Sequence, residues 1–106
     1  MNDSHNELNI ENYLLLKNSQ EPHVLVDVRQ PDEYQEVSMP GAVLMPLDIF
    51  EKRMFELDKN KTIVLQCRSG VRSLVAQEIL KKAGFKKTYN LTGGILAWLD
   101  FHQSNQ

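Results

Sequence analysis

Short apolar runs alternate with segments of helical periodicity along this chain. The runs Val24–Val28 and Thr62–Leu65 are almost continuously apolar or β-branched, and Ala42–Met45 and Thr88–Leu91 are shorter runs of similar character. A run without alternation is typical of a strand that is covered on both faces, as in a parallel sheet. These four runs are therefore predicted to be strands.

Helical segments are predicted between the strands. Asn9 and Asp48 are suited to cap the helices that follow them, and Pro31 is suited to the first turn of a helix, because these residue types favour helix N-termini. Gly84 is suited to end the helix that precedes it, as the residue just beyond the last helical turn. The predicted segments are Ile10 to about Lys17, a short turn over Pro31–Tyr34, Ile49 to about Leu57, Val71–Ala83, and Ile95 to about Phe101.

The segment Val71–Ala83 is predicted to be an amphipathic helix. The apolar residues expected on its buried face are Val71, Leu74, Val75, Ile79 and Leu80.

Strands that alternate with helices predict an α/β fold with a central parallel sheet of about five strands, flanked by helices on both faces. The length of 106 residues suits one domain over 1–106, in which Met1–Glu7 is expected to be a flexible polar leader. In such a sheet, ligands bind beyond the carboxyl ends of the strands. Asp27, Arg29 and Cys67 all lie at such ends.

Charge and composition exclude several classes of function. The net charge of −2 and pI near 5.9 do not suit a general binder of nucleic acid or of membrane surfaces. No apolar run approaches the ~20 residues that span a bilayer, and the polar, acidic start is unlike a signal peptide. A cytoplasmic location is expected. No metal site is expected, because the histidines are far apart and lack companions at ligand spacing, and no cofactor is expected either; the histidines are His5, His23 and His102.

Cys67 is the only cysteine, and it opens a short loop between the strand Thr62–Leu65 and the helix Val71–Ala83. A thiol there meets backbone N–H groups without intrahelical partners, and the helix dipole favours an anion. We expect its pKa to lie well below ~8.5 and the thiolate to be a nucleophile. A single cysteine excludes an internal disulfide, so the chemical partner of Cys67 must come from outside the chain.

A lone cysteine is more often a small buried hydrophobe than a catalyst. Here the cysteine follows the strand, two arginines flank it, and Ser69, Gly70 and Ser73 suit a tight turn that cradles an anion. Arg72 can fix the loop or bind an anionic substrate, while Arg68 adds a positive field at the approach.

The loop sequence suits sulfur chemistry. Attack of the thiolate on an anionic sulfur donor leaves a persulfide on Cys67, and the N–H groups that stabilise the thiolate also suit the persulfide. Gly70 can adopt a positive φ without steric cost.

The chain resembles a single-domain rhodanese, a sulfurtransferase, over nearly its whole length. Four stretches carry the resemblance in order: Asp27-Val28-Arg29-Gln30-Pro31-Asp32-Glu33-Tyr34, Met39-Pro40-Gly41-Ala42, Cys67-Arg68-Ser69-Gly70-Val71-Arg72-Ser73, and Tyr89-Asn90-Leu91-Thr92-Gly93-Gly94 with Trp98.

The resemblance implies a catalytic cysteine, Cys67, and a persulfide intermediate. It implies transfer of a sulfane sulfur from an anionic donor such as thiosulfate to cyanide, a thiol or a protein acceptor. The cradle and substrate-binding residues would be Arg68, Ser69, Gly70, Val71 and Arg72, with Asp27 and Arg29 as a structural pair near the loop. One position departs from the family: Ser38 stands where a histidine is common, so no general base is assigned there.

Three other functions remain open. Cysteine-dependent phosphatases place an arginine six positions after the cysteine, whereas here Ser73 has that position and Arg72 lies five positions after Cys67. This shorter loop favours sulfur over phosphate. A second alternative is a non-catalytic rhodanese-like module for protein interaction or regulation. A third is an oxidant sensor, which would need an external thiol to resolve it.

Overall fold

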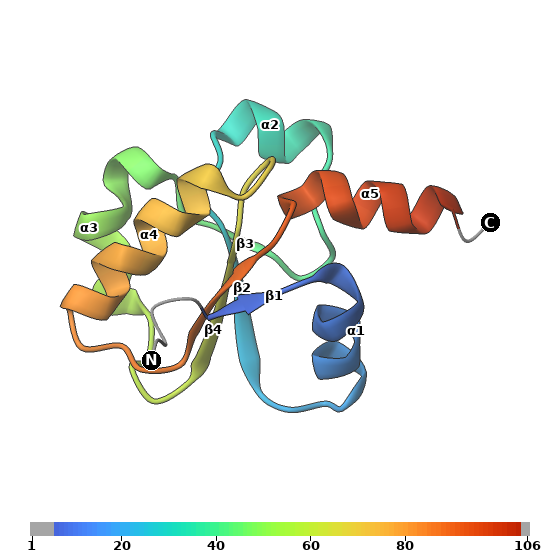
Figure 1. Cartoon of the computed structure of the whole chain (residues 1–106). Helices are drawn as coiled ribbons and strands as arrows, with labels where there is room; N and C mark the ends of the chain where they lie inside the picture. Colours follow the sequence, from blue (N-terminus) through green and yellow to red (C-terminus); the bar gives the residue numbers. More distant parts are fainter. Residues whose placement is uncertain (1–5, 105–106) are drawn as a thin grey trace.

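The computed structural model describes residues 6–104 and contains one parallel sheet. The strand order is β1-β5-β4-β2-β3, and every adjacent pair is parallel. The central strands therefore form the middle of the molecule (Figure 1), as the apolar runs predicted. The strands are β1 Glu7–Leu8, β2 His23–Asp27, β3 Val43–Leu44, β4 Thr62–Gln66 and β5 Thr88–Leu91.

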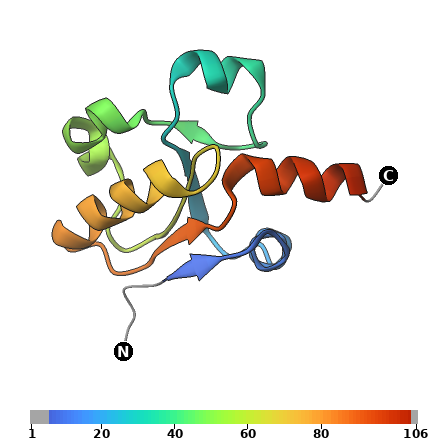
Figure 2. The same ribbon diagram turned by 45° about the horizontal axis from the view of Figure 1, so that its top comes forward.

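Helices cover both faces of the sheet (Figure 2). On one face, Phe50, Ala76 and Leu80 of α3 and α4 pack on Val26 and Leu65 of the sheet. The other face is covered by α1 and α5, whose apolar residues form a second cluster with the sheet. The predicted α/β fold is confirmed. The α-helices are α1 Ile10–Asn18, α2 Pro31–Glu36, α3 Phe50–Arg53, α4 Val71–Lys82 and α5 Gly94–Ser104.

The N-terminal segment contains a strand that the sequence analysis missed. β1 pairs with β5, where Glu7 lies opposite Asn90 and Leu8 opposite Leu91. The predicted leader is therefore wrong at Glu7, and residues 1–5 lie outside the described part of the chain. Asn9 caps α1 as predicted, because its side-chain oxygen accepts the N–H of Asn12 at 2.8 Å.

The helix predicted over Ile49–Leu57 is broken into short pieces. A 3-10 turn, Leu47–Ile49, precedes α3, and a second, Met54–Glu56, follows it. Asp48 does not cap a helix by its side chain; its Oδ1 instead accepts the amide of Gln30 at 3.3 Å.

The buried face of α4 differs from the predicted one. Leu80 is buried as predicted, but Val71 is 68% exposed, and Leu74 and Val75 are exposed as well. The polar residue Gln77 is buried on this face instead, because its side chain hydrogen-bonds to the sheet. Its Nε2 donates to the carbonyls of Asn6 and Thr88, each at 3.0 Å. The residues buried along this face are Ser73, Ala76, Gln77 and Leu80.

Candidate active site

The loop from Cys67 to Gly70 connects β4 to α4 at the carboxyl edge of the sheet. Cys67 is only 1% exposed. Its sulfur accepts the N–H of Gly70 at 3.1 Å and that of Ser73 at 3.4 Å, and the Ser73 hydroxyl lies 3.3 Å from it. The thiol is thus buried among inward-facing donors rather than among apolar side chains alone.

Asn90 at the end of β5 holds this loop from one side. Its side-chain amide donates to the carbonyl of Gly70 at 3.2 Å, and its oxygen accepts the hydroxyl of Ser73 in a short hydrogen bond. Gly70 has φ of +109°, a left-handed conformation that glycine adopts without strain. Asn90 therefore fixes both the turn and the hydroxyl that faces the sulfur.

The start of α5 holds the same loop from the other side. The N–H of Ile95 donates to the carbonyl of Cys67 at 2.8 Å, and that of Leu96 to the carbonyl of Arg68 at 3.2 Å. A Cβ on Gly94 would overlap both of those carbonyls, so only glycine permits this close approach. Because the loop carbonyls are bound by α5, the loop N–H groups are free to point toward the sulfur.

Two opposing effects set the pKa of Cys67. Burial raises it, because a low-dielectric environment disfavours the thiolate. The N–H groups of Ser73, Gly70 and Ser69 donate to the sulfur and the Ser73 hydroxyl lies against it. These contacts together outweigh burial, so the pKa is lowered from its ordinary value. This direction agrees with the sequence-based expectation.

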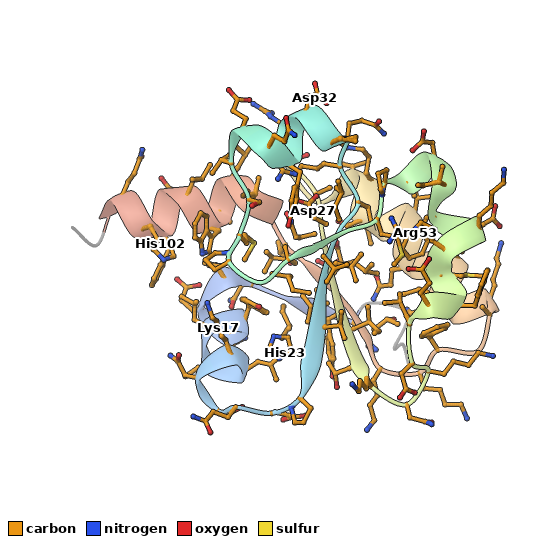
Figure 3. All side chains as sticks on the ribbon, turned by 180° about the vertical axis from the view of Figure 1, so that it is seen from behind. Lys17, His23, Asp27, Asp32, Arg53 and His102 are labelled. Carbon is orange, nitrogen blue, oxygen red and sulfur yellow. The ribbon has the colours of Figure 1, made fainter. Side chains whose placement is uncertain are left out.

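Asp27, the last residue of β2, and Arg29, two residues beyond it, form a buried ion pair at the end of the strand next to β4. Arg29 Nη2 and Nε lie 2.7 and 3.1 Å from Asp27 Oδ2, and the N–H of Arg29 also donates to this carboxylate. Figure 3 shows Asp27 at the carboxyl end of its strand. Arg29 further donates to the carbonyl of Val37 at 2.8 Å, which ties the segment after α2 to the sheet. Ser38, half-buried, comes next in that segment.

Arg72 is bound to a carboxylate that the sequence analysis did not single out. Its Nη1 and Nη2 donate to the two oxygens of Glu33 at 2.8 and 3.0 Å. Arg68, Ser69 and Val71, in contrast, are exposed to solvent. Of the predicted binding residues, Gly70 has its N–H on the sulfur, whereas the guanidinium of Arg72 faces Glu33 of α2.

Two residues that contact the loop, Asn90 and Glu33, were not singled out from the sequence. Asn90 lies in the short strand β5, and its burial beside the cysteine loop is evident only from the structure. Glu33 lay inside a recognised motif, yet nothing local indicated its contact with a residue 39 positions away.

The described residues hold no group of three or more His, Cys, Asp or Glu side chains suited to a metal ion. His5 lies outside the described range. In residues 6–104, no helix is both long and apolar enough to cross a membrane.

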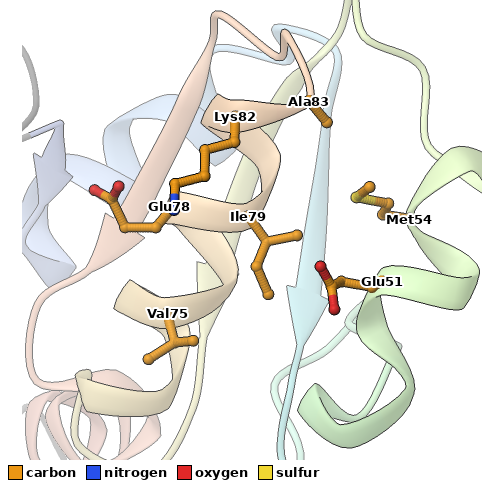
Figure 4. A pocket seen from close by; sticks show the side chains of 7 residues that line it. All are labelled: Glu51, Met54, Val75, Glu78, Ile79, Lys82 and Ala83. Carbon is orange, nitrogen blue, oxygen red and sulfur yellow. The ribbon is translucent and has the colours of Figure 1, made fainter.

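A hollow of about 400 Å³ lies away from the cysteine loop, between α3 and α4 (Figure 4). None of the residues 67–72 contributes to its wall. It is therefore separate from the candidate site. It is lined by Glu51, Met54, Val75, Glu78, Ile79, Lys82 and Ala83.

Comparisons with known proteins identify relatives. The family model described as "Rhodanese-like domain" matches residues 11–101. The chain is 39% identical over 92 residues to the "Putative sulfur carrier protein YrkF" of Bacillus subtilis, covering 87% of this chain and 50% of that protein. It is 37% identical over 93 residues to a "Sulfurtransferase" of Allochromatium vinosum, covering 88% of this chain and 87% of that protein.

A solved structure shows the same fold. The crystal structure of a rhodanese-like domain protein from Staphylococcus aureus superposes with a TM-score of 0.82 at 28% identity, covering 88% of this chain and 90% of that one. The chain thus spans half of the length of one curated relative and most of the length of another.

Proposed function

Because this chain belongs to the rhodanese-like domain family, we propose that it is a sulfurtransferase in which Cys67 carries the sulfur as a persulfide. The observation that carries the proposal is the set of N–H groups, from Gly70 and Ser73, that donate to the sulfur. Names of relatives, a sulfur carrier protein and a sulfurtransferase, support the same class of chemistry.

The first half of the reaction loads the sulfur. The thiolate of Cys67 attacks the outer sulfur of an anionic donor such as thiosulfate. A bond forms between the two sulfurs, the sulfur–sulfur bond of the donor breaks, and sulfite leaves with the electron pair. We expect the new terminal sulfur near the N–H groups of Val71 and Arg72, which begin α4 and have no acceptor within the helix.

The second half returns the sulfur to an acceptor. Cyanide or the thiolate of a small molecule or protein attacks the terminal sulfur of the persulfide. The bond to Cys67 breaks, and the electron pair returns to the Cys67 thiolate. No net oxidation occurs, so no redox cofactor is needed for the cycle.

The test is addition of sulfur to Cys67. Treatment with thiosulfate is expected to increase the intact mass by one sulfur atom, and cyanide is expected to remove it and release thiocyanate. Because Cys67 is the only cysteine, the added atom can be assigned without ambiguity. Cys67→Ser should gain no sulfur and show no turnover.

The pH dependence of alkylation of Cys67 provides a second readout. Since the pKa of Cys67 is lowered, its rate of alkylation should decline with falling pH at a midpoint below that of a free thiol. A folded protein that gains no sulfur from thiosulfate or from a persulfide donor would instead support the non-catalytic interaction module. Sulfur transfer by Cys67→Ser would rule out the assignment of the cysteine.

A further inference from the structure

The guanidinium of Arg72 is the group of the loop best suited to bind the anionic part of a sulfur donor, because its planar fork matches sulfonate and carboxylate oxygens. In the structure this fork is already occupied by Glu33 through two hydrogen bonds of 2.8 and 3.0 Å. The pair is partly open to solvent, with 35% of the Arg72 side chain and 28% of the Glu33 side chain exposed.

Glu33 is held in place from its own helix. Its Oε1 accepts the N–H of Gln30 at 2.9 Å, which forms part of the capping box of α2. The pKa of Glu33 is lowered to about 2, first by the hydrogen bond from Arg72 and then by that from Gln30. The carboxylate is therefore charged throughout the neutral range, and it competes with any external anion for the same guanidinium.

The surrounding charges are also paired. Asp27 and Arg29 neutralise one another in the interior, and Glu33 and Arg72 do so at the surface. Among the described residues, the cation of the loop that forms no ion pair is Arg68, whose side chain is exposed. The site thus offers a donor ring for a single sulfur atom but no free guanidinium fork from α4.

We propose, on the basis of the sulfur transfer proposed above, that Glu33 is a specificity-determining residue that occupies the anion subsite at Arg72. It disfavours compact donors with a sulfonate group, such as thiosulfate, relative to persulfides of thiols, R–S–SH. For a persulfide, the Cys67 thiolate attacks the terminal sulfur, the donor sulfur–sulfur bond breaks, and the thiolate R–S⁻ leaves. This donor requires only the ring of N–H groups.

The variant Glu33→Gln tests this role with little change in shape. Glutamine retains an oxygen for the N–H of Gln30 but loses the charge that holds Arg72. The matched control is Asp32→Asn, which removes one negative charge from the same helix. Asp32 is exposed in the first turn of α2, and Figure 3 shows it away from Asp27. If the loss of one negative charge acted only through the electrostatic potential at the site, both variants would change the rate with thiosulfate by a similar factor.

The experiment measures single-turnover formation of the Cys67 persulfide by mass spectrometry, with thiosulfate and with the persulfide of 2-mercaptoethanol. Because an ion pair exposed to this degree contributes up to ~1 kcal/mol, Glu33→Gln should raise the rate constant with thiosulfate about threefold to fivefold. The rate constant with the persulfide should stay unchanged in both variants, as should the thiosulfate rate of Asp32→Asn.

Two results would overturn the proposal. An unchanged thiosulfate rate in Glu33→Gln would place the donor anion elsewhere, for example at Arg68. An equal gain with both donors would show that Glu33 restricts access in general and does not select among donors.

A binding measurement separates this proposal from the proposed function. In the Cys67→Ser background, which cannot turn over, calorimetry should show tighter binding of thiosulfate when Glu33→Gln is added and no change when Asp32→Asn is added. Absence of sulfur on Cys67 with every donor would contradict the sulfurtransferase function, whereas equal binding in the three proteins would contradict the role of Glu33.

Discussion

Two arginine–carboxylate pairs lie at the same edge of the sheet and differ in burial and in the number of hydrogen bonds. Asp27 and Arg29 are both almost fully buried, with side-chain exposures of 0% and 4%. Glu33 and Arg72 form a contact of two hydrogen bonds, and about a third of each side chain is exposed. Arg29 also donates to the carbonyl of Val37, whereas Arg72, within residues 6–104, binds Glu33 alone. The contributions of the two pairs to stability should therefore differ because of both solvent and the additional partner.

We expect the buried pair to stabilise the fold and, on the function proposed above, the exposed pair to take part in binding the donor. A buried charge that loses its partner is left without water, and this is costly. An exposed charge that loses its partner is solvated again, so its removal costs little. Nearness to the loop therefore does not indicate what an arginine does; burial separates the structural pair from the one that can exchange its carboxylate for a ligand.

The largest effect is expected from Arg29→Ala. This change leaves the buried Asp27 carboxylate without its cation and the carbonyl of Val37 without its donor, so the free energy of unfolding should fall by about 3–5 kcal/mol. Urea unfolding followed by circular dichroism measures it. Arg29→Lys retains the positive charge but not the planar guanidinium, so its free energy of unfolding should lie between those of the native protein and Arg29→Ala. A loss no larger than that of Arg72→Ala would show that burial is not what distinguishes the pairs.

The comparison also shows which parts of the protein the sequence could predict. The central strands were predicted because β2 and β4 are buried on both faces and read as apolar runs. β1 was missed because it has two residues, Glu7 and Leu8, and no apolar run marks it. Its position depends on pairing with β5, a contact that is distant in sequence.

The face of α4 was predicted wrongly for a related reason. Apolar periodicity assigned Val71, Leu74 and Val75 to the core, but the helix is oriented by hydrogen bonds of Ser73 and Gln77 to the loop and to β5. A pattern of hydrophobicity contains no information on such polar contacts. The cysteine loop itself was predictable, since its residues are consecutive between a strand and a helix.

The contact of Arg72 is a further feature that the sequence could not predict. Its spacing from Cys67 placed it in the loop, but two directions for its side chain remained open from the sequence. The structure directs it to Glu33, 39 positions away, on a helix whose position depends on the whole fold. Sequence therefore identified the candidate and the tertiary contact determined its partner.

A smaller effect is expected from Arg72→Ala. Loss of the exposed pair should lower the free energy of unfolding by at most ~1 kcal/mol. The rate of sulfur loading from thiosulfate should nevertheless fall several-fold, because the guanidinium is the anion subsite proposed here. Urea unfolding and single-turnover mass spectrometry on the same sample measure the two quantities. A variant that unfolds like Arg29→Ala would instead make Arg72 a structural residue.

The smallest effect is the acid dependence of the exposed pair. The pKa of Glu33 is lowered in the folded protein from 4.5 to about 2. A lowered carboxyl pKa contributes stability that is present above the unfolded pKa and is lost as the pH falls through the folded one. The difference in free energy of unfolding between the native protein and Glu33→Gln should thus stay constant above pH 4.5, at under ~1 kcal/mol, and shrink toward pH 2.

The difference in free energy of unfolding between the native protein and Glu33→Gln reports the contribution of Glu33 alone, because the other titratable groups are present in both proteins. Chemical unfolding at a series of pH values measures it, and adding Arg72→Ala to both proteins is the control. Without the guanidinium, the difference in free energy of unfolding between the two proteins should nearly vanish at neutral pH, since its main source is the bond from Arg72. A difference that persists at pH 2, or that survives loss of Arg72, would mean that Glu33 acts through its cap on α2 and not through the ion pair.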